Sequence, residues 1–352
     1  MRRISGSGLT KIQAVVVVAV IVIAAIGGFW YYWFTGGSQK IILKVFCAGS
    51  LTLPFEDIEA QFEADHQDVN VEIEPSGSMV AIQKITEVDK AADVLASADY
   101  TLIPKMMMTS NSNYTDWYIK FAKNRMTIAY TDNSRYADEI NSTNWYQILR
   151  GSDVKWGFSN PNMDPCGYRS PIVIQLAEFE YGDDMIFEDL IEANSDITVS
   201  ESDGIYTIDT NMTDLNPTDK VKIRDKSVEL VTFVQAGGLD YAFEYSSVAK
   251  QHELKFLELP ESIDLSSDDY KDTYKKVKVR KTTKISTGKP IVYGLTILNN
   301  APNPTLAEEF VQYIINDFGQ GVLRDNAQPP IVPAKANDID KIPVSLKPYV
   351  TG

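Results

Sequence analysis

Two short turns in the first quarter of the sequence place a serine directly after small residues. Ala48-Gly49-Ser50 follows an apolar stretch at residues 41–46, and Pro75-Ser76-Gly77-Ser78 follows an alternating stretch at residues 69–74. Each turn leads into a helical pattern, so it directs backbone N–H groups, a hydroxyl and the positive end of a helix dipole toward one point. Such a point attracts an anion. The alternative is that Ser50 and Ser78 are ordinary helix N-caps.

Two acidic residues occupy comparable positions later in the chain. Asp164 follows a strand pattern and precedes a helix, and Glu244 ends the strand pattern of residues 240–244. They could simply complement helix dipoles. If they face the same cleft as Ser50 and Ser78, two carboxylates point at an anion, and repulsion at ~4 Å costs several kcal/mol in a protein-like dielectric. A cation would remove this conflict, and so would molybdate or tungstate, whose large hexavalent metal accepts further oxygen ligands.

The sequence offers little for catalysis. Its two histidines, His66 and His252, lie in polar contexts, and no zinc-protease pair, P-loop, dinucleotide fingerprint or Gly-x-Ser-x-Gly elbow is present. We therefore expect a protein that is not an enzyme. A surface hydrolase that uses Ser50 as its nucleophile is retained as the less favoured alternative.

Charge and length narrow the function further. The chain has 352 residues and a formal net charge of −15, which argues against binding nucleic acid through its phosphates. A basic run at residues 271–284, with valines interleaved, predicts an amphipathic edge strand. Because the whole protein is acidic, an anion site has to be made locally from donors and dipoles.

The N-terminus predicts a membrane anchor. Residues 12–34 contain no charge, and as a helix they would span about 35 Å. Basic residues precede this segment within residues 1–11, and four aromatic residues end it, so we expect an uncleaved signal anchor with a cytoplasmic start and the remaining chain outside the cell membrane. A cleaved signal peptide is the alternative. Residues 35–40 are a short linker.

The body of the chain predicts an α/β protein with two lobes. Strand, small-residue turn and helix alternate over residues 41–96, as expected for a parallel sheet with ligands at the carboxyl ends of its strands. We assign residues 41–127 and 286–352 to lobe one and residues 128–285 to lobe two. Residues 195–220 are polar without periodicity and predict a surface excursion.

Four segments in this order resemble the archaeal-type molybdate/tungstate-binding proteins of ABC importers, the WtpA/ModA group. The resemblance covers residues 41–345 and implies a periplasmic-binding-protein-like fold, in which each lobe has a central mixed sheet flanked by helices and the ligand lies in the interlobe cleft. It also implies delivery of the ion to a permease and its ATPase. The segments are Phe46-Cys47-Ala48-Gly49-Ser50-Leu51, Pro75-Ser76-Gly77-Ser78, Asp164-Pro165-Cys166-Gly167-Tyr168-Arg169 and Phe243-Glu244-Tyr245-Ser246-Ser247-Val248-Ala249.

The same resemblance implies roles for individual residues. Asp164 and Glu244 match the two carboxylates that complete octahedral coordination of the metal. The oxygens are surrounded by hydroxyls and backbone groups at five positions: Gly49, Ser50, Ser78, Pro165 and Cys166. No cofactor is implied beyond the tungstate or molybdate ligand. The sequence departs from the family in its membrane anchor, which replaces a lipid-modified cysteine, and in residues 195–220.

The two cysteines and the nature of the oxyanion leave alternatives open. We expect Cys47 and Cys166 to be free thiols that line the site, although two unrelated buried residues would fit equally well. A sulfate or phosphate receptor would use the same turns without needing the carboxylates. A structural envelope glycoprotein would bind no oxyanion.

Overall fold

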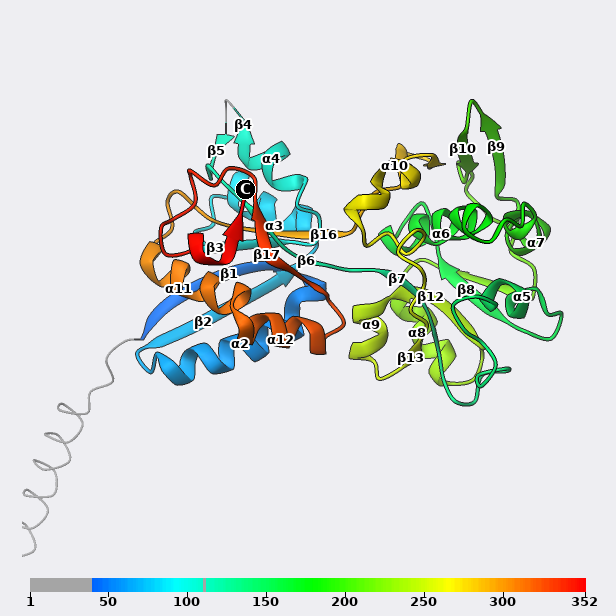
Figure 1. Ribbon diagram of the computed structural model, residues 1–352, viewed down its shortest axis with the longest axis horizontal. Coiled ribbons are helices and arrows are strands. Elements are labelled where there is room, and N and C mark those ends of the chain that lie inside the picture. The colour runs from blue at the N-terminus through cyan, green and yellow to red at the C-terminus, as the bar shows by residue number, and fades with distance from the viewer. Residues whose placement is uncertain (1–39, 110–111) are drawn as a thin grey trace, which may run out of the picture.

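The computed structural model describes residues 40–109 and 112–352, and it consists of two lobes side by side (Figure 1). Lobe one contains residues 40–123 and 292–352, and lobe two contains residues 126–287. The predicted α/β fold with two lobes is confirmed. The predicted anchor at residues 12–34 lies outside the described residues. Among the residues that are described, none of the helices combines the length and apolar character needed to span a bilayer.

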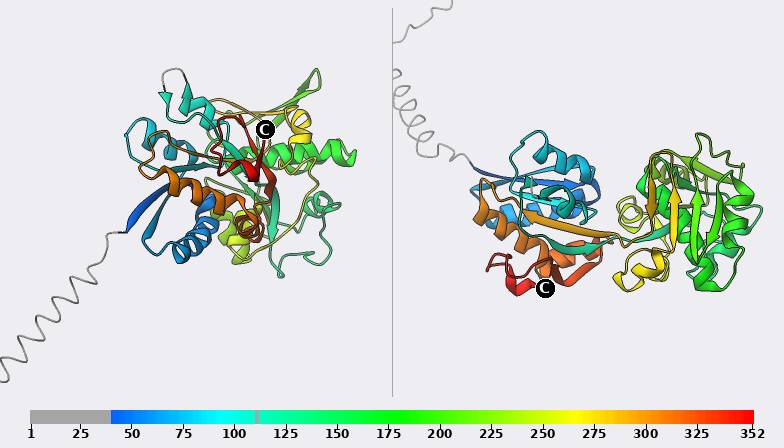
Figure 2. Two further views of the ribbon diagram at one scale, coloured as in Figure 1. Left: turned by 60° about the vertical axis from the view of Figure 1, so that its left-hand side comes forward. Right: turned by 90° about the horizontal axis from the view of Figure 1, so that it is seen from above.

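Lobe one is built on a mixed seven-stranded sheet. Strand β1 pairs in parallel with β2 and β3, whereas β16 pairs antiparallel with β3 and β6. The C-terminal strands and helices therefore return to complete the lobe that the N-terminal strands begin (Figure 2). The order is β18-β17-β6-β16-β3-β1-β2, with bounds β1 (Ile41–Ala48), β2 (Val69–Ser76), β3 (Val94–Ser97), β6 (Ile119–Lys123), β16 (Val292–Ile297), β17 (Pro330–Ala336) and β18 (Val350–Thr351).

Helices cover both faces of this sheet because its central strands are apolar on both sides. In β1, Val45 belongs to the core under one face and Phe46 to the core under the other, which is the pattern of a buried parallel strand. The first face is covered by α2 (Thr52–Asp65), α11 (Pro304–Ile315) and α12 (Asp317–Asp325), and the second by α3 (Ser78–Thr86) and α4 (Leu102–Met107). A 3-10 turn, η1 (Gly49–Leu51), joins β1 to α2, and a small ribbon pairs β4 (Met108–Thr109) with β5 (Ser112–Asn113).

Lobe two contains a five-stranded sheet in the order β11-β8-β12-β7-β13. Its core includes several aromatic side chains among the aliphatic ones, and the buried rings of Trp156 and Phe243 meet edge to face. The strands are β7 (Met126–Tyr130), β8 (Trp156–Ser159), β11 (Val221–Arg224), β12 (Tyr241–Tyr245) and β13 (Lys255–Phe256). The helices are α5 (Trp145–Arg150), α6 (Pro165–Tyr181), α7 (Ile186–Leu190), α8 (Ser227–Gln235), α9 (Ser246–Gln251) and α10 (Lys271–Tyr274). The short 3-10 turns are η2 (Glu192–Asn194), η3 (Asp268–Tyr270) and, in lobe one, η4 (Lys347–Tyr349).

One prediction about lobe two was only partly right, and another was wrong. Residues 195–220 lie at the surface as predicted, but they are not irregular, because β9 (Thr198–Ser202) and β10 (Ile205–Asp209) form a hairpin there. Asp203 and Gly204 make its two-residue turn with φ of 53° and 74°, the geometry for which Asp-Gly is favoured. The basic run is not an edge strand either. Its strand β14 (Val277–Arg280) lies between β10 and β15 (Ile285–Thr287) and buries its two valines in the core.

The predicted lobe boundaries need a small correction. The boundary between residues 127 and 128 falls inside β7, which belongs wholly to the sheet of lobe two, and the boundary between residues 285 and 286 falls inside β15. The chain instead crosses between lobes at Asn124–Arg125 and at residues 288–291. Both crossings are short extended segments that hydrogen-bond to each other, since the Asn124 N–H donates to the Ile291 carbonyl at 2.9 Å.

Candidate functional site

A cavity of about 410 Å³ lies between the two lobes, beside the crossing segments. Lobe one contributes Ser50 and Ser78, which follow the carboxyl ends of β1 and β2. Lobe two contributes Arg169 from the first turns of α6 and Tyr245 from the end of β12. Tyr293 of β16 forms part of the wall near the crossing. The two serine turns predicted from the sequence therefore do converge on one space.

Ser50 is held with its hydroxyl oxygen already occupied as an acceptor. The Tyr293 hydroxyl donates to Ser50 Oγ at 3.0 Å, and the Tyr293 oxygen in turn accepts from Asn124 Nδ2 at 2.8 Å. Neither η1 nor α2 has a side-chain cap, so N-capping does not explain this serine. Because Ser50 accepts from Tyr293, its own hydrogen is available to donate to a ligand acceptor.

Ser78 has the same arrangement with a different donor. It is the first residue of α3, after the N-cap residue Gly77, and that helix also lacks a side-chain cap. The backbone N–H of Ala98 donates to Ser78 Oγ at 2.9 Å, which again leaves the hydroxyl hydrogen free to donate. The N-capping alternative is thus wrong for both serines. The wall of lobe one therefore presents two neutral donors, which suit an oxyanion, together with the Asp99 carboxylate, which is paired with Lys289 at 2.6 Å.

The hydrogen bonds behind Ser50 form a buried polar cluster that sequence reasoning missed. Asn124 Nδ2 also donates to Ser247 Oγ at 2.8 Å, and Ser246 Oγ donates to Asn124 Oδ1 at 3.2 Å. Gln328 Nε2 donates to the Ser50 carbonyl at 2.6 Å. Each of these hydrogen bonds joins residues more than a hundred positions apart along the chain, so no local pattern could have grouped them.

Asp164 is the N-cap of α6, as one of the two predicted alternatives requires. Its Oδ1 accepts from the Cys166 N–H at 3.3 Å, and its Oδ2 accepts from the Ser227 N–H at 2.8 Å. The residue lines a second cavity, of about 500 Å³, which adjoins the first and shares Pro165 and Tyr168 with it. Asp164 therefore lies at the edge of the interlobe space with both carboxylate oxygens already bonded.

Glu244 is fully buried and lines neither of these cavities. One carboxylate oxygen accepts from the Tyr245 N–H at 2.7 Å, and the other is buried with no hydrogen-bond partner among the residues that the structure describes. Burial raises the pKa of Glu244 to about 7. Both Glu244 and Asp164 lie close enough to Cys166 to raise the pKa of its thiol, although burial is the larger cause. The structure thus brings the two carboxylates into one region of lobe two but not to one cavity.

The cysteines and Gly49 lie away from the cavity wall. Both thiols are free and buried, with Cys47 in the core of lobe one and Cys166 in the core of lobe two. The Cys166 thiol contacts the Phe243 carbonyl at 3.6 Å. This arrangement fits the alternative of two unrelated buried residues rather than thiols lining the site. Gly49 is exposed in η1, where its carbonyl accepts from the Thr52 hydroxyl at 2.7 Å.

Two cavity-lining residues of lobe two received no separate role from the sequence. The Arg169 side chain is only 8% exposed, and its guanidinium donates to the Tyr245 hydroxyl. The guanidinium carbon also lies 5.2 Å from the ring centroid of Tyr168 and 5.5 Å from that of Tyr245. Only their position inside the resembling segments, next to Asp164 and Glu244, pointed to them.

The adjoining cavity is basic although the protein is acidic. It is lined by Lys105 of lobe one, by Lys281 and Lys284 of the β14–β15 turn, and by Lys289 of the crossing segment. Among these, Lys289 pairs with Asp99 at 2.6 Å. An anion approaching the interlobe space therefore meets a locally positive surface.

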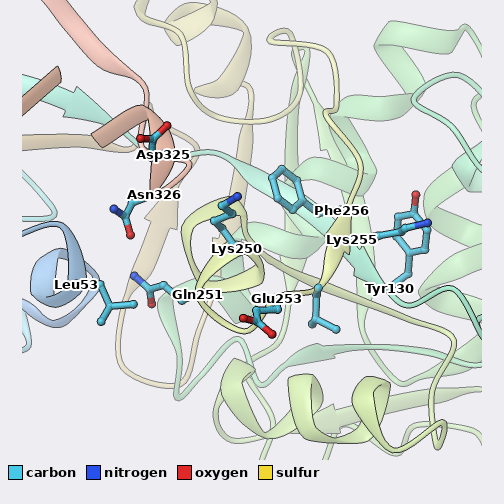
Figure 3. Close-up of a pocket in the computed structure, with 10 residues that line it drawn as sticks. Leu53, Tyr130, Lys250, Gln251, Glu253, Lys255, Phe256, Asp325 and Asn326 are labelled. Atoms are coloured by element: carbon cyan, nitrogen blue, oxygen red, sulfur yellow. The ribbon is translucent and has the colours of Figure 1, made fainter. Parts of the chain in front are cut away.

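A third and wider cavity, of about 640 Å³, is lined by Leu53 and Asn326 of lobe one and by residues of lobe two that include Gln251 (Figure 3). Gln251 of lobe two, which lines it, donates to the Ser50 carbonyl at 3.4 Å. Its charged lining mixes Lys250 and Lys255 with Glu253 and Asp325, so it offers no excess of one charge. We therefore assign the candidate site to the smaller cavity with the two serines. Within the described residues, no three His, Cys, Asp or Glu side chains converge as a metal site.

Comparison with known proteins agrees with this geometry. Residues 43–326 match the bacterial extracellular solute-binding proteins. The chain belongs to this family. A solute-binding protein of Methanoculleus marisnigri is 53% identical over 302 residues, 84% of either chain. The molybdate/tungstate-binding protein WtpA of Pyrococcus abyssi is 42% identical over 324 residues, 89% of this chain and 91% of that one.

A solved structure supports the fold of this solute-binding protein. A substrate binding domain from Clostridium difficile aligns with 83% of this chain and 100% of its own, with a TM-score of 0.53 and 15% sequence identity. At that identity the likeness concerns the two-lobed architecture alone. The resemblance inferred from the four sequence segments is confirmed by the family match and by the identity to WtpA.

Proposed function

We propose that this solute-binding protein captures molybdate or tungstate outside the cell and delivers it to an ABC importer. One observation carries the proposal: two serine hydroxyls of lobe one, both oriented as donors, face a buried arginine of lobe two across one cavity. Donors and a cation suit a tetrahedral oxyanion. The choice of ion rests on the identity to a molybdate/tungstate-binding protein.

In the proposed mechanism, Ser50 and Ser78 hold the oxygens, and the lobes close about the crossing segments. Of the two carboxylates proposed to reach the metal, Asp164 lines the adjoining cavity, whereas Glu244 lines neither cavity. Coordination by Glu244 requires its side chain to leave its buried position, so its part in binding depends on closure. The bound ion undergoes no reaction, and no resident cofactor takes part.

We further propose that residues 12–34 tether the protein to the cell membrane with the lobes outside. A permease and an ATPase subunit are the expected protein partners. The support is the uncharged segment behind a basic start and the transport role of solute-binding proteins.

Isothermal titration of the full chain with tungstate, molybdate, sulfate and phosphate tests the ligand. We expect one site per chain for tungstate and molybdate, with sulfate and phosphate at least about 100-fold weaker, a difference of about 2.7 kcal/mol. Sulfate or phosphate binding as tight as tungstate would favour the sulfate- or phosphate-type receptor. Absence of saturable binding by every anion would favour a structural glycoprotein, and ester hydrolysis that disappears in Ser50→Ala would favour the hydrolase.

A further inference from the structure

We propose that Arg169 is the charge-selecting residue of the interlobe cavity, so that it favours a dianion over a monoanion of the same shape. This inference rests on the proposed function, because it takes the ligand to be a tetrahedral oxyanion. The sequence assigned Arg169 no role of its own. The case depends on its burial, on its lack of a counter-charge and on its position in the cavity wall.

The guanidinium of Arg169 is buried without an acidic partner. Among the arginines that the structure describes, it alone is buried. Other described arginines, such as Arg125, Arg150 and Arg280, each pair with a carboxylate within 4 Å. No such ion pair is found for Arg169 within residues 40–109 and 112–352, and its Nε has no hydrogen-bond partner. A cation in this position is costly unless an anion joins it.

The neighbours of Arg169 stabilise it without neutralising it. The rings of Tyr168 and Tyr245 lie within cation–π distance. The Tyr245 hydroxyl accepts from the guanidinium, so its own hydrogen remains free to donate toward the cavity. Across the cavity, the Asp99 carboxylate lies near enough to Arg169 to act on its charge, but it forms its ion pair with Lys289 at 2.6 Å. The positive charge of Arg169 is therefore left for a ligand.

Lys284 offers an internal comparison. It lines the same cavity but is exposed, so water screens its charge, whereas the charge of Arg169 acts at low dielectric. A ligand with two negative charges gains more from a buried cation than a ligand with one. Tungstate and perrhenate are tetrahedral oxyanions of similar size that differ by one charge, so they separate the effect of charge from that of shape.

The test measures tungstate and perrhenate affinities of the full-length wild type, Arg169→Gln, Arg169→Lys and Lys284→Gln by titration and competition. We expect Arg169→Gln to lower tungstate affinity about 100-fold and perrhenate affinity no more than about 10-fold. The ratio of the two affinities should then fall at least about 10-fold. Arg169→Lys, which keeps the charge, should keep most of the wild-type ratio, and Lys284→Gln, which removes a screened charge from the same cavity, should lower the ratio less than Arg169→Gln does.

Equal losses for the two ions in Arg169→Gln would overturn the inference, because a merely structural arginine affects both alike. Thermal melting checks that each variant folds. If Arg169→Gln does not fold, Arg169→Lys provides the test. This variant retains the positive charge, so a fall in its ratio of tungstate affinity to perrhenate affinity would overturn the inference. A wild type that binds no tungstate would overturn the proposed function and this inference together. If the wild type binds tungstate and Arg169→Gln keeps the wild-type ratio of tungstate affinity to perrhenate affinity, only the inference about Arg169 is overturned.

Discussion

The two lobes contribute different chemistry to the same cavity. Lobe one offers neutral donors, Ser50 and Ser78, each fixed by a hydrogen bond that occupies its oxygen, and its lining carboxylate, Asp99, is already paired with Lys289. Lobe two offers ionisable groups: Arg169, Asp164 at the cavity edge and, behind the wall, Glu244. Neutral donors respond to the shape and hydrogen-bonding capacity of a ligand, whereas buried charges respond to its net charge. Recognition is thus divided between the lobes, and it is complete only when both contact the ion.

The donor side of this comparison is tested most strongly by the double variant Ser50→Ala, Ser78→Ala. Hydrogen bonds to a charged group contribute about 1.5–3 kcal/mol each, so we expect tungstate affinity to fall about 10²–10⁴-fold. Calorimetry measures the loss. Ser76→Ala is the matched control, because Ser76 lies in the same turn but outside the cavity lining and should bind like the wild type. A double variant with unchanged affinity would contradict the role of lobe one.

The buried carboxylate of Glu244 in lobe two should make the stability of the protein depend on pH. Burial raises the pKa of Glu244 to about 7, so the folded state binds this proton more tightly than the unfolded state does. Stability should therefore fall as pH rises from about 4.5 to 7, by up to about 3 kcal/mol for this group. Glu244→Gln removes the effect, so the variant should gain stability over the wild type at pH 8 and gain little at pH 4.5. Denaturant unfolding at both pH values measures the difference, and equal gains at both would contradict the buried, protonated state.

The contributions of Asp164 and Glu244 to tungstate affinity can be compared by substituting each with its amide. Asp164→Asn weakens the N-cap of α6 and the bond to the Ser227 N–H, so we expect a loss of stability of about 1–2 kcal/mol. Because Asp164 also borders the cavity, tungstate affinity should fall about 10-fold or more, whereas Glu244→Gln should change it less than about 3-fold. Calorimetry and thermal melting report the two effects. Large, equal losses of affinity would show that Glu244 reaches the metal on closure, as the family resemblance implies, and a six-coordinate metal-edge X-ray absorption spectrum would agree.

The smallest expected effect concerns the support behind Ser50. Tyr293→Phe removes the hydroxyl that donates to Ser50, so we expect stability and the binding free energy of tungstate each to weaken by about 1 kcal/mol. Tyr274→Phe is the control, because the Tyr274 hydroxyl is buried in lobe two, where it donates to the Glu261 carbonyl. That variant should lose stability alone. Unchanged affinity in Tyr293→Phe would show that Ser50 is oriented without it.

Local patterns predicted much of the fold but only part of the site. The alternation of strand, small-residue turn and helix predicted over residues 41–96 is the β1, α2, β2, α3 and β3 order of lobe one, because apolar periodicity marks these elements. The hairpin of β9 and β10 was missed because its strands are polar, although its Asp203-Gly204 turn was a usable signal. The convergence of the serine turns followed from parallel-strand topology.

Properties that depend on distant residues could not be predicted. The donor role of Ser50 depends on Tyr293, which lies 243 positions later in the chain. The burial of Glu244 and the unpaired state of Arg169 are set by the packing of β12 and α6 in lobe two, which the identity of neighbouring residues does not reveal. Asp164 and Glu244 have similar sequence contexts, but Asp164 lies at the cavity edge, whereas Glu244 is fully buried.

The position of the Tyr293 hydroxyl also bears on how movement of the lobes would affect the cavity wall. This one oxygen contacts Ser50, which faces the ion, and Asn124, which lies in a crossing segment and is bonded to Ser246 and Ser247 of lobe two. A rotation of the lobes that lengthened the bonds of Asn124 would therefore also alter the support of the Ser50 hydroxyl. The atoms that connect the lobes are thus the atoms that orient a donor of the cavity wall.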